Sequence, residues 1–361
     1  MSRSARSDGV TPRAGSAATF FAVTPCPEDT GVRFRMSVPG DVVDHRQRTR
    51  FFGKWQSCQQ SFGNEFTENR RHDMSNRAAL GSSLPATGIE NAYERFAPLA
   101  EKYWGPDLHN GYWFDGADDS SLEEATARLA ELVIDKLRVS SGDRVLDVGC
   151  GNGRPTVAAG ARTGADITGI DVNRRALREA ATHASSNGVS HYVSFEYADA
   201  LNPPFRTESF DAVMSVESSP HFETGELLSS MARLLRPGGL LVLETPYARV
   251  RMTERLRART AEYYELIQAV SLDTLQRYFE LAHAAGLAPV EFLDITENTA
   301  PTWPTALRRL RDDWGEIERS LGSELPERAI ATTSAWRELP ELGIMILTLR
   351  RDDALSASRG A

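Results

Sequence analysis

The 361-residue sequence is poor in cysteine and lacks any long apolar run. Its three cysteines, Cys26, Cys58 and Cys150, show no Cys-x-x-Cys or Cys/His spacing of the kind that binds zinc. We therefore expect no metal and no structural disulfide, a pattern typical of a reducing cytoplasm. No stretch approaches the roughly 18 apolar residues of a membrane span, and the N-terminus has no signal-peptide core. The sequence predicts a soluble cytoplasmic protein without a membrane partner.

Positive charge is scarce over most of the chain. The net charge is −9, but residues 1–73 carry 11 Lys/Arg against 8 Asp/Glu, so the remainder is strongly acidic. Because phosphate backbones are bound by clustered Lys and Arg, this balance argues against a nucleic-acid substrate. The basic stretch over 249–259 lies on a predicted amphipathic helix and is interpreted as its solvated face.

The domain organisation follows from periodicity. Hydrophobic residues make up 41% of the chain and charged residues 25%, enough for a full α/β core. Residues 1–73 mix isolated aromatics with Arg, Ser, Gly and Pro and sustain neither helical nor strand periodicity. We predict an irregular, disordered N-terminal extension over 1–88, one domain over 89–350, and a disordered tail over 351–361.

The most informative segment is 145–155. A short apolar run predicts a buried strand, alternating glycines follow at 149, 151 and 153, and Pro155 suits the first turn of a helix. Such a junction lets a ligand lie against bare backbone at a helix N-terminus. A dinucleotide fingerprint would need a third glycine where Arg154 stands. The spacing present is instead D-x-G-x-G-x-G, beginning at Asp147; a tight turn without a ligand is the structural alternative.

Further strands and helices alternate after this junction. A second predicted strand ends at Asp171, 22 residues after Gly149, where an acid can accept both hydroxyls of a ribose. Asp171 could also cap the helix that follows, and both roles can hold at once. A third strand precedes Asp199 and Ala200; a fourth spans 209–217, and a Pro-Gly-Gly turn opens a fifth. Helices are predicted over 122–137, 156–162, 174–186, 225–235 and 272–285, and two final strands over 289–295 and 343–349.

In this order, the pieces resemble the class I S-adenosylmethionine-dependent methyltransferases. The resemblance implies an α/β fold with a doubly wound, Rossmann-like sheet of seven strands, the last one antiparallel. It also implies S-adenosyl-L-methionine as cofactor and Asp199 as the ligand of the adenine amino group. The cofactor-binding residues predicted within the core are Asp147, Gly149, Gly151, Gly153, Asp171, Asp199, Ala200 and Glu217.

A narrower resemblance rests on residues 108–113. Their sequence matches the L-H-x-G-Y-[WF] motif of small-molecule methyltransferases, which include sterol, tocopherol and bacterial natural-product O-methyltransferases such as the rebeccamycin sugar enzyme. In that group the N-terminal aromatic residues form a lid over cofactor and substrate. The implied lid residues are Tyr93, Tyr103, His109 and Tyr112, with Tyr93 and Tyr103 as further cofactor ligands. Core packing is the alternative, because aromatic residues dominate core burial.

The predicted catalytic residue is His221. It lies just past the fourth strand, at the edge where open α/β sheets bind ligands, and neutral imidazole suits proton removal near pH 7. In the resembling natural-product enzymes, a histidine in this stretch is the proposed base. Those enzymes often carry a second histidine where this chain has Pro220, and an acid near the fifth strand, where this chain reads Glu244. A packing or helix-capping histidine is the alternative.

Two helical stretches fall outside the repeating unit. They lie over 250–270 and over 306–321 with 324–336, and we expect cap elements, about 246–271 and 297–340, to form an acceptor pocket. The leading hypothesis is methyl transfer to a hydroxyl of a small-molecule secondary metabolite. N- or C-methylation and a non-catalytic cofactor-binding protein are alternatives, and Arg154 disfavours an oxidoreductase. We expect a small-molecule partner, with a homodimer left open.

Overall fold

The computed structural model describes residues 20–25, 32–37, 105, 109–266, 268–321, 327, 330 and 339–352. Tyr93 and Tyr103 lie outside the described residues, as do most of the predicted helix over 324–336 and most of the C-terminal tail. Within the described part, no helix is long and apolar enough to cross a membrane. The same residues contain no group of three His, Cys, Asp or Glu side chains placed to hold a metal ion.

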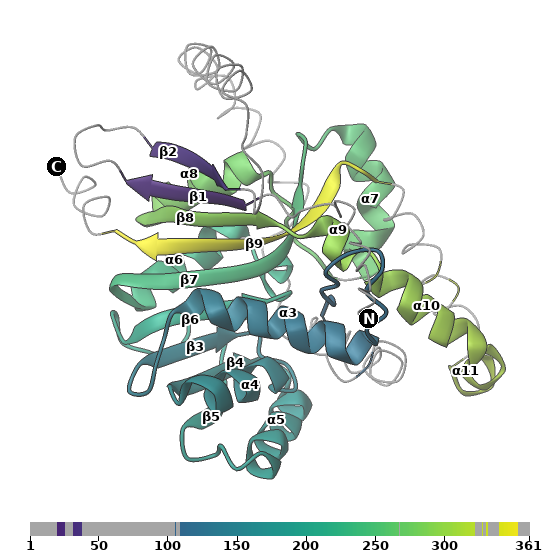
Figure 1. Cartoon of the computed structure of the whole chain (residues 1–361), viewed down its shortest axis with the longest axis horizontal. Coiled ribbons are helices and arrows are strands. Elements are labelled where there is room, and N and C mark those ends of the chain that lie inside the picture. The colour runs from purple at the N-terminus through teal and green to yellow at the C-terminus, as the bar shows by residue number, and fades with distance from the viewer. Residues whose placement is uncertain are drawn as a thin grey trace, which may run out of the picture.

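One mixed sheet runs through the molecule in the order β2-β1-β8-β9-β7-β6-β3-β4-β5 (Figure 1). From β5 to β7 the neighbouring strands are parallel, and β9 pairs antiparallel with both β7 and β8. The strand order reverses between β3 and β6, which is the point where open α/β sheets bind ligands. The strands are β1 (Phe20–Pro25), β2 (Val32–Ser37), β3 (Arg144–Val148), β4 (Asp166–Asp171), β5 (Val193–Tyr197), β6 (Phe210–Val216), β7 (Leu235–Ala248), β8 (Leu287–Asp294) and β9 (Leu342–Arg351).

The seven-stranded, doubly wound prediction is confirmed by β3 to β9. Helices cover both faces of this sheet, with α3 crossing one face in Figure 1 and α6 behind the other. The helices are α3 (Leu122–Leu137), α4 (Arg154–Thr163), α5 (Arg174–Ser186), α6 (Thr224–Leu234), α7 (Glu254–Leu266), α8 (Leu275–Ala285), α9 (Thr296–Thr299), α10 (Thr302–Asp312) and α11 (Trp314–Leu321), with a 3₁₀ turn η1 (Ser219–His221).

The core lies in two layers because successive side chains of a strand point to opposite faces. In β3, Leu146 and Val148 join the cluster that contains residues of α6 and α8. Val145, which precedes Leu146 and so points to the opposite face, joins the cluster built with α3, α4 and α5. The apolar run that precedes the glycines is therefore buried on both sides, as expected for a central parallel strand.

The N-terminal extension departs from the prediction. Residues Phe20–Pro25 and Val32–Ser37 form an antiparallel pair, and β1 also pairs with β8. The prediction of an irregular segment over 1–88 is therefore wrong for these two strands. The physical reason is that β8 would otherwise end the sheet with unpaired backbone groups, and both segments are rich in residues that favour strands. Six-residue segments were too short to reveal this pairing by periodicity.

The predicted Pro-Gly-Gly turn lies inside β7 as a bulge. Phe210 of β6 faces Leu235, whereas Ala212, two residues on, faces Leu240. The extra residues of β7 are accommodated by Gly238 at φ +79°. A Cβ on Gly239 would lie 2.8 Å from the Asp211 carbonyl oxygen, so only glycine fits there.

The cap helices lie beyond the end of the sheet where β7 ends (Figure 1). The prediction of one helix over 306–321 is wrong in its continuity. Helix α10 begins four residues earlier, at Thr302, and ends at Asp312, and α11 starts at Trp314. The break at Asp313 is consistent with the Asp-Asp pair at 312–313, because Asp competes with helical backbone hydrogen bonds. Helix α7 falls within the predicted stretch over 250–270.

Candidate active site

The glycine turn has left-handed backbone at three alternate positions. Gly149, Gly151 and Gly153 have φ of +68°, +52° and +76°. A Cβ on Gly149 would overlap the side chain of Ser218, and one on Gly153 would lie 2.6 Å from Ala180 Cβ. Among the residues that the structure describes, none lies within 4 Å of a Cβ built on Gly151. Packing therefore requires glycine at the first and third positions, whereas the middle one presents bare backbone that no described side chain covers.

Asp171 ends β4 and holds this turn. Its Oδ2 accepts a hydrogen bond of 2.9 Å from the Gly151 N–H, and its Oδ1 accepts one of 2.8 Å from the Asn173 N–H. Burial raises the pKa of this carboxyl, with the backbone donors acting in the opposite direction. Helix α5 is capped by Asn173, whose side chain accepts from Arg175 and Ala176. The helix-cap alternative for Asp171 is therefore wrong.

Asp147 lies beneath the turn rather than on its surface. The side chain is only 2% exposed, and its Oδ2 accepts a 2.6 Å hydrogen bond from the hydroxyl of Thr156 in α4. Burial raises its pKa to about 7, and the nearby charge of Asp171 adds to that shift. Asp147 thus ties β3 to the first turn of α4, and so fixes the two ends of the glycine turn.

Asp199 and Ala200 follow β5 at the same edge of the sheet. Asp199 is exposed and its Oδ1 accepts from the Leu201 N–H at 2.9 Å. Ala200 is buried, and its carbonyl accepts from the Ser230 hydroxyl of α6 at 2.8 Å. This segment is adjacent to Asp171, whose carbonyl accepts from the Ala198 N–H. Asp199 is therefore exposed at this edge of the sheet, whereas Ala200 is held against α6.

Glu217 is the first residue after β6 and has an unusual backbone conformation. Its φ is +53°, a left-handed value that is unfavourable for a residue with a Cβ. Its Oε1 accepts a 2.5 Å hydrogen bond from the side-chain amide of Asn110, and its N–H donates to the Glu244 carbonyl. Burial raises its pKa to about 8.

Glu244 of β7 is fully buried next to Glu217. Burial raises its pKa well above the usual range, and the charge of Glu217 adds to this, while the Asn110 amide acts weakly in the opposite direction. Within the described part of the chain, neither oxygen of Glu244 makes a hydrogen bond of normal geometry. The adjacent carboxyls of half-buried Glu217 and buried Glu244 favour a state in which at least one holds a proton at neutral pH. Sequence reasoning missed Asn110, although it is part of the 108–113 motif.

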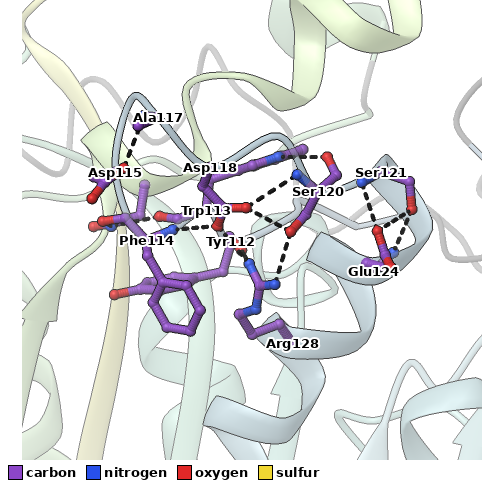
Figure 2. A network of polar contacts seen from close by, with 11 residues as sticks. Tyr112, Trp113, Phe114, Asp115, Ala117, Asp118, Ser120, Ser121, Glu124 and Arg128 are labelled. Atoms are coloured by element: carbon purple, nitrogen blue, oxygen red, sulfur yellow. Dashed lines mark hydrogen bonds and ion pairs between the residues drawn. The ribbon is translucent and has the colours of Figure 1, made fainter.

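Two of the four predicted lid residues, His109 and Tyr112, are described. Both belong to a segment that hydrogen bonds hold to neighbouring elements. His109 is buried with Nδ1 2.9 Å from the Asn110 carbonyl oxygen, and Tyr112 is half-buried. The Arg128 guanidinium of α3 donates to the Tyr112 carbonyl, to Asp118 and to Ser120 (Figure 2). The segment is also held on its other side by the cap. The Gly111 N–H donates to the Thr302 hydroxyl, the Trp113 N–H to the Asn298 carbonyl, and the Asn298 amide to the Trp113 carbonyl.

His221 ends η1, which follows β6 after Glu217 and Ser218. Its side chain is 7% exposed and Nδ1 lies 3.0 Å from the main-chain carbonyl oxygen of Gln268. Burial lowers its pKa below the ordinary 6.5, with the charge of Asp171 acting against this shift. The imidazole is therefore neutral at pH 7. Glu244, the acid near the fifth predicted strand, interacts with Glu217. The carboxylate whose charge acts on His221 is instead that of Asp171. Sequence reasoning also missed Gln268, which no local motif marks.

These residues suit a nucleoside cofactor. Bare backbone at Gly151, the carboxyl of Asp171 on the adjacent strand, and the point of strand reversal lie together at the carboxyl edge of the sheet. A charged sulfur nucleoside has ribose hydroxyls that can donate hydrogen bonds to a carboxylate. Its amino-acid portion needs a backbone turn that no side chain obstructs. The site thus fits S-adenosylmethionine.

Comparisons with known proteins agree. Residues 145–239 match a family described as a methyltransferase domain. The chain is 34% identical over 270 residues to the 27-O-demethylrifamycin SV methyltransferase of Amycolatopsis mediterranei (strain S699), covering 73% of this chain and 97% of that protein. It is 33% identical over 261 residues to the methyltransferase GfsG of Streptomyces halstedii, covering 72% and 92%. A solved structure, the [4+2]-cyclase SpnF, superposes with a TM-score of 0.66 at 25% identity, covering 75% of this chain and 98% of that one.

The chain therefore belongs to the S-adenosylmethionine-dependent methyltransferases. The predictions of an enzyme, of this cofactor and of a resemblance to natural-product O-methyltransferases are confirmed. The roles of individual site residues stay predictions.

Proposed function

We propose that this enzyme transfers a methyl group from S-adenosylmethionine to a hydroxyl of a small-molecule natural product, with His221 as general base. The observation that carries the proposal is a buried, neutral imidazole in the turn after β6, near enough to Asp171 for the charge of that carboxylate to act on it. Support for a hydroxyl acceptor comes from relatives named as O-methyltransferases.

Most of the residues predicted for the cofactor would contact it, whereas buried Asp147 would only fix the turn. Asp171 would accept the ribose hydroxyls, Gly149 to Gly153 would lie along the nucleoside, and Asp199 with Ala200 would meet the adenine. Glu217 would bound the site on the β6 side. Tyr93 and Tyr103 stay predictions, because they lie outside the described residues. The limits of the domain and the acceptor pocket over 246–271 and 297–340 also stay predictions.

The chain has little covalent chemistry to perform. The bound cofactor supplies an activated methyl group, so the residues must orient the acceptor and exclude water, which is worth ~7–11 kcal/mol of barrier when geometry is good. A hydroxyl must also lose its proton as its oxygen attacks. His221 would accept that proton, and general-base assistance contributes about 10²- to 10⁴-fold.

N- and C-methylation are the alternatives from the same family. An amine attacks through its own lone pair, so it depends less on a base. The fold also serves other reactions, since one similar structure is named a [4+2]-cyclase. The acceptor atom therefore has to be tested directly.

The test is methyl transfer from isotopically labelled S-adenosylmethionine to paired acceptors that differ only in a hydroxyl or an amine. 27-O-demethylrifamycin SV, after which one relative is named, is the first hydroxyl acceptor to try. We expect label on oxygen and a loss of 10²-fold or more in kcat for His221→Asn. Label on nitrogen, or unchanged turnover of His221→Asn, would overturn the proposal.

A further inference from the structure

The connection between α7 and α8 lies against the turn that carries His221. The Val270 N–H donates to the Pro220 carbonyl at 2.7 Å, and the Ser271 hydroxyl donates to the Phe222 carbonyl at 2.8 Å. These two contacts bracket His221 on both sides in the sequence. The connection is therefore fixed at the residues before and after the imidazole, although 47 positions separate His221 from Gln268.

Gln268 presents its carbonyl to the imidazole from a left-handed backbone. Its φ is +53°, and its carbonyl oxygen lies 3.0 Å from His221 Nδ1. A main-chain carbonyl can only accept a hydrogen bond, so the hydrogen of this contact must reside on Nδ1. In a neutral imidazole the other nitrogen, Nε2, is then unprotonated and has a lone pair.

We propose that Gln268 is a positioning residue, whose carbonyl fixes His221 in the Nδ1–H tautomer so that Nε2 is the proton-accepting nitrogen. The inference rests on the proposed function for its catalytic meaning, but the tautomer itself is independent of the acceptor. The proton lost by the acceptor hydroxyl goes to Nε2, which gives an imidazolium with both nitrogens protonated. The Nδ1–H bond to Gln268 persists in both states, so the ring need not rotate during proton transfer.

The direct test is a long-range ¹H–¹⁵N correlation spectrum of the histidine-labelled full chain at a pH where His221 is neutral. The seven histidines each give a pattern that separates a protonated from an unprotonated ring nitrogen. Comparison with His221→Asn assigns the signal of interest. We expect protonated Nδ1 and unprotonated Nε2 in the wild type. The opposite tautomer would overturn the proposal without any variant at position 268.

The variant test exploits the backbone conformation of Gln268. Gln268→Val places a β-branched residue at positive φ and should displace the carbonyl, whereas Gln268→Gly keeps both the carbonyl and access to that conformation. We expect Gln268→Val to mix the two tautomers and lower kcat at least tenfold, with KM for the cofactor unchanged. Gln268→Gly should keep the wild-type tautomer and turn over at least tenfold faster than Gln268→Val.

A matched control separates strain from positioning. Arg138 also has positive φ, +55°, but caps the C-terminus of α3. Arg138→Val should lower thermal stability without altering the His221 signal. A wild-type tautomer and kcat in Gln268→Val would overturn the proposal. If the tautomer is as expected but His221→Asn keeps full turnover, the base assignment fails and the tautomer assignment stands. If His221→Asn loses turnover but the opposite tautomer is found, the tautomer assignment alone is overturned.

Discussion

The Gly151 N–H donates a 2.9 Å hydrogen bond to the Asp171 carboxylate, so the acid that ends β4 orients the backbone turn that ends β3. The same carboxylate accepts from Asn173 through its other oxygen. One side chain thus joins the tips of two adjacent parallel strands. Its two oxygens fix the turn against which the cofactor is expected to lie.

Gly149→Ala and Gly151→Ala should fail in different ways. Alanine at 149 meets Ser218 as well as positive φ, so we expect a loss of roughly 2–5 kcal/mol in the free energy of unfolding. Alanine at 151 has only the backbone cost, about 1–2 kcal/mol, but its methyl group occupies the open space. Gly151→Ala should therefore fold and lose S-adenosylhomocysteine affinity. Urea unfolding and equilibrium dialysis measure the two effects; equal affinity in Gly151→Ala and the wild type would contradict the cofactor's placement.

Asp147 predicts a pH dependence of stability. Its folded pKa, about 7, is above the ordinary 3.8, so the folded state binds more protons than the unfolded state between these values. Stability therefore falls as pH rises from about 4 to 7, by up to about 4 kcal/mol. Asp147→Asn keeps an acceptor for the Thr156 hydroxyl and removes this dependence. Urea unfolding at pH 5, 6, 7 and 8 should show the variant gaining on the wild type with pH. Parallel profiles would be inconsistent with a raised pKa.

We predict that Asn110 links the 108–113 motif to the adjacent carboxyls of Glu217 and Glu244. Asn110→Ala removes the amide donor to Glu217, so we expect a loss of about 1–3 kcal/mol in the free energy of unfolding. Asn110→Asp places a third carboxyl beside Glu217 and Glu244 and should be worse than alanine at pH 8. The difference should shrink at pH 5, because all three carboxyls then favour the protonated state. Asn187→Ala, at an exposed helix end, is the control. A pH-independent difference would contradict the prediction.

His221 predicts the acid limb of the pH–rate profile. A general base must be unprotonated, and burial lowers the pKa of His221 below 6.5. We therefore expect kcat/KM to stay level at neutral pH and to decline only below pH 6.5. The measurement is initial rate against pH at low acceptor concentration. A decline centred above pH 7 would assign the limb to another group, such as Glu217.

Much of this site could be predicted because its signals are local. The glycine turn was visible since Gly149, Gly151 and Gly153 are needed by backbone conformation. The bounds of α3 and α5 matched the predictions of 122–137 and 174–186. In α3, Ser121 and Glu124 form a capping box, and in α5 Asn173 is the cap.

The parts that could not be predicted depend on distant contacts. Asn110 and Glu217 meet across 107 positions, and neither residue alone carries a signal for the other. The pairing of β1 with β8 depends on an open sheet edge that exists only after the sheet has formed. The cap of α5 went to Asn173 rather than Asp171 because the Asp171 carboxylate is turned toward Gly151.

We propose that Asp171 and the glycine turn bind the nucleoside of S-adenosylmethionine. Isothermal titration calorimetry of the full chain with S-adenosylhomocysteine and, separately, with NADH tests it most directly. We predict binding of the first ligand and none of the second, with about 10- to 100-fold weaker affinity for Asp171→Asn, since hydrogen bonds to a charged group are worth about 1.5–3 kcal/mol. Asp211→Asn, at the opposite end of the parallel strands, should bind as the wild type does. Equal affinity of Asp171→Asn and the wild type, or preference for NADH, would show that Asp171 does not bind the nucleoside of S-adenosylmethionine.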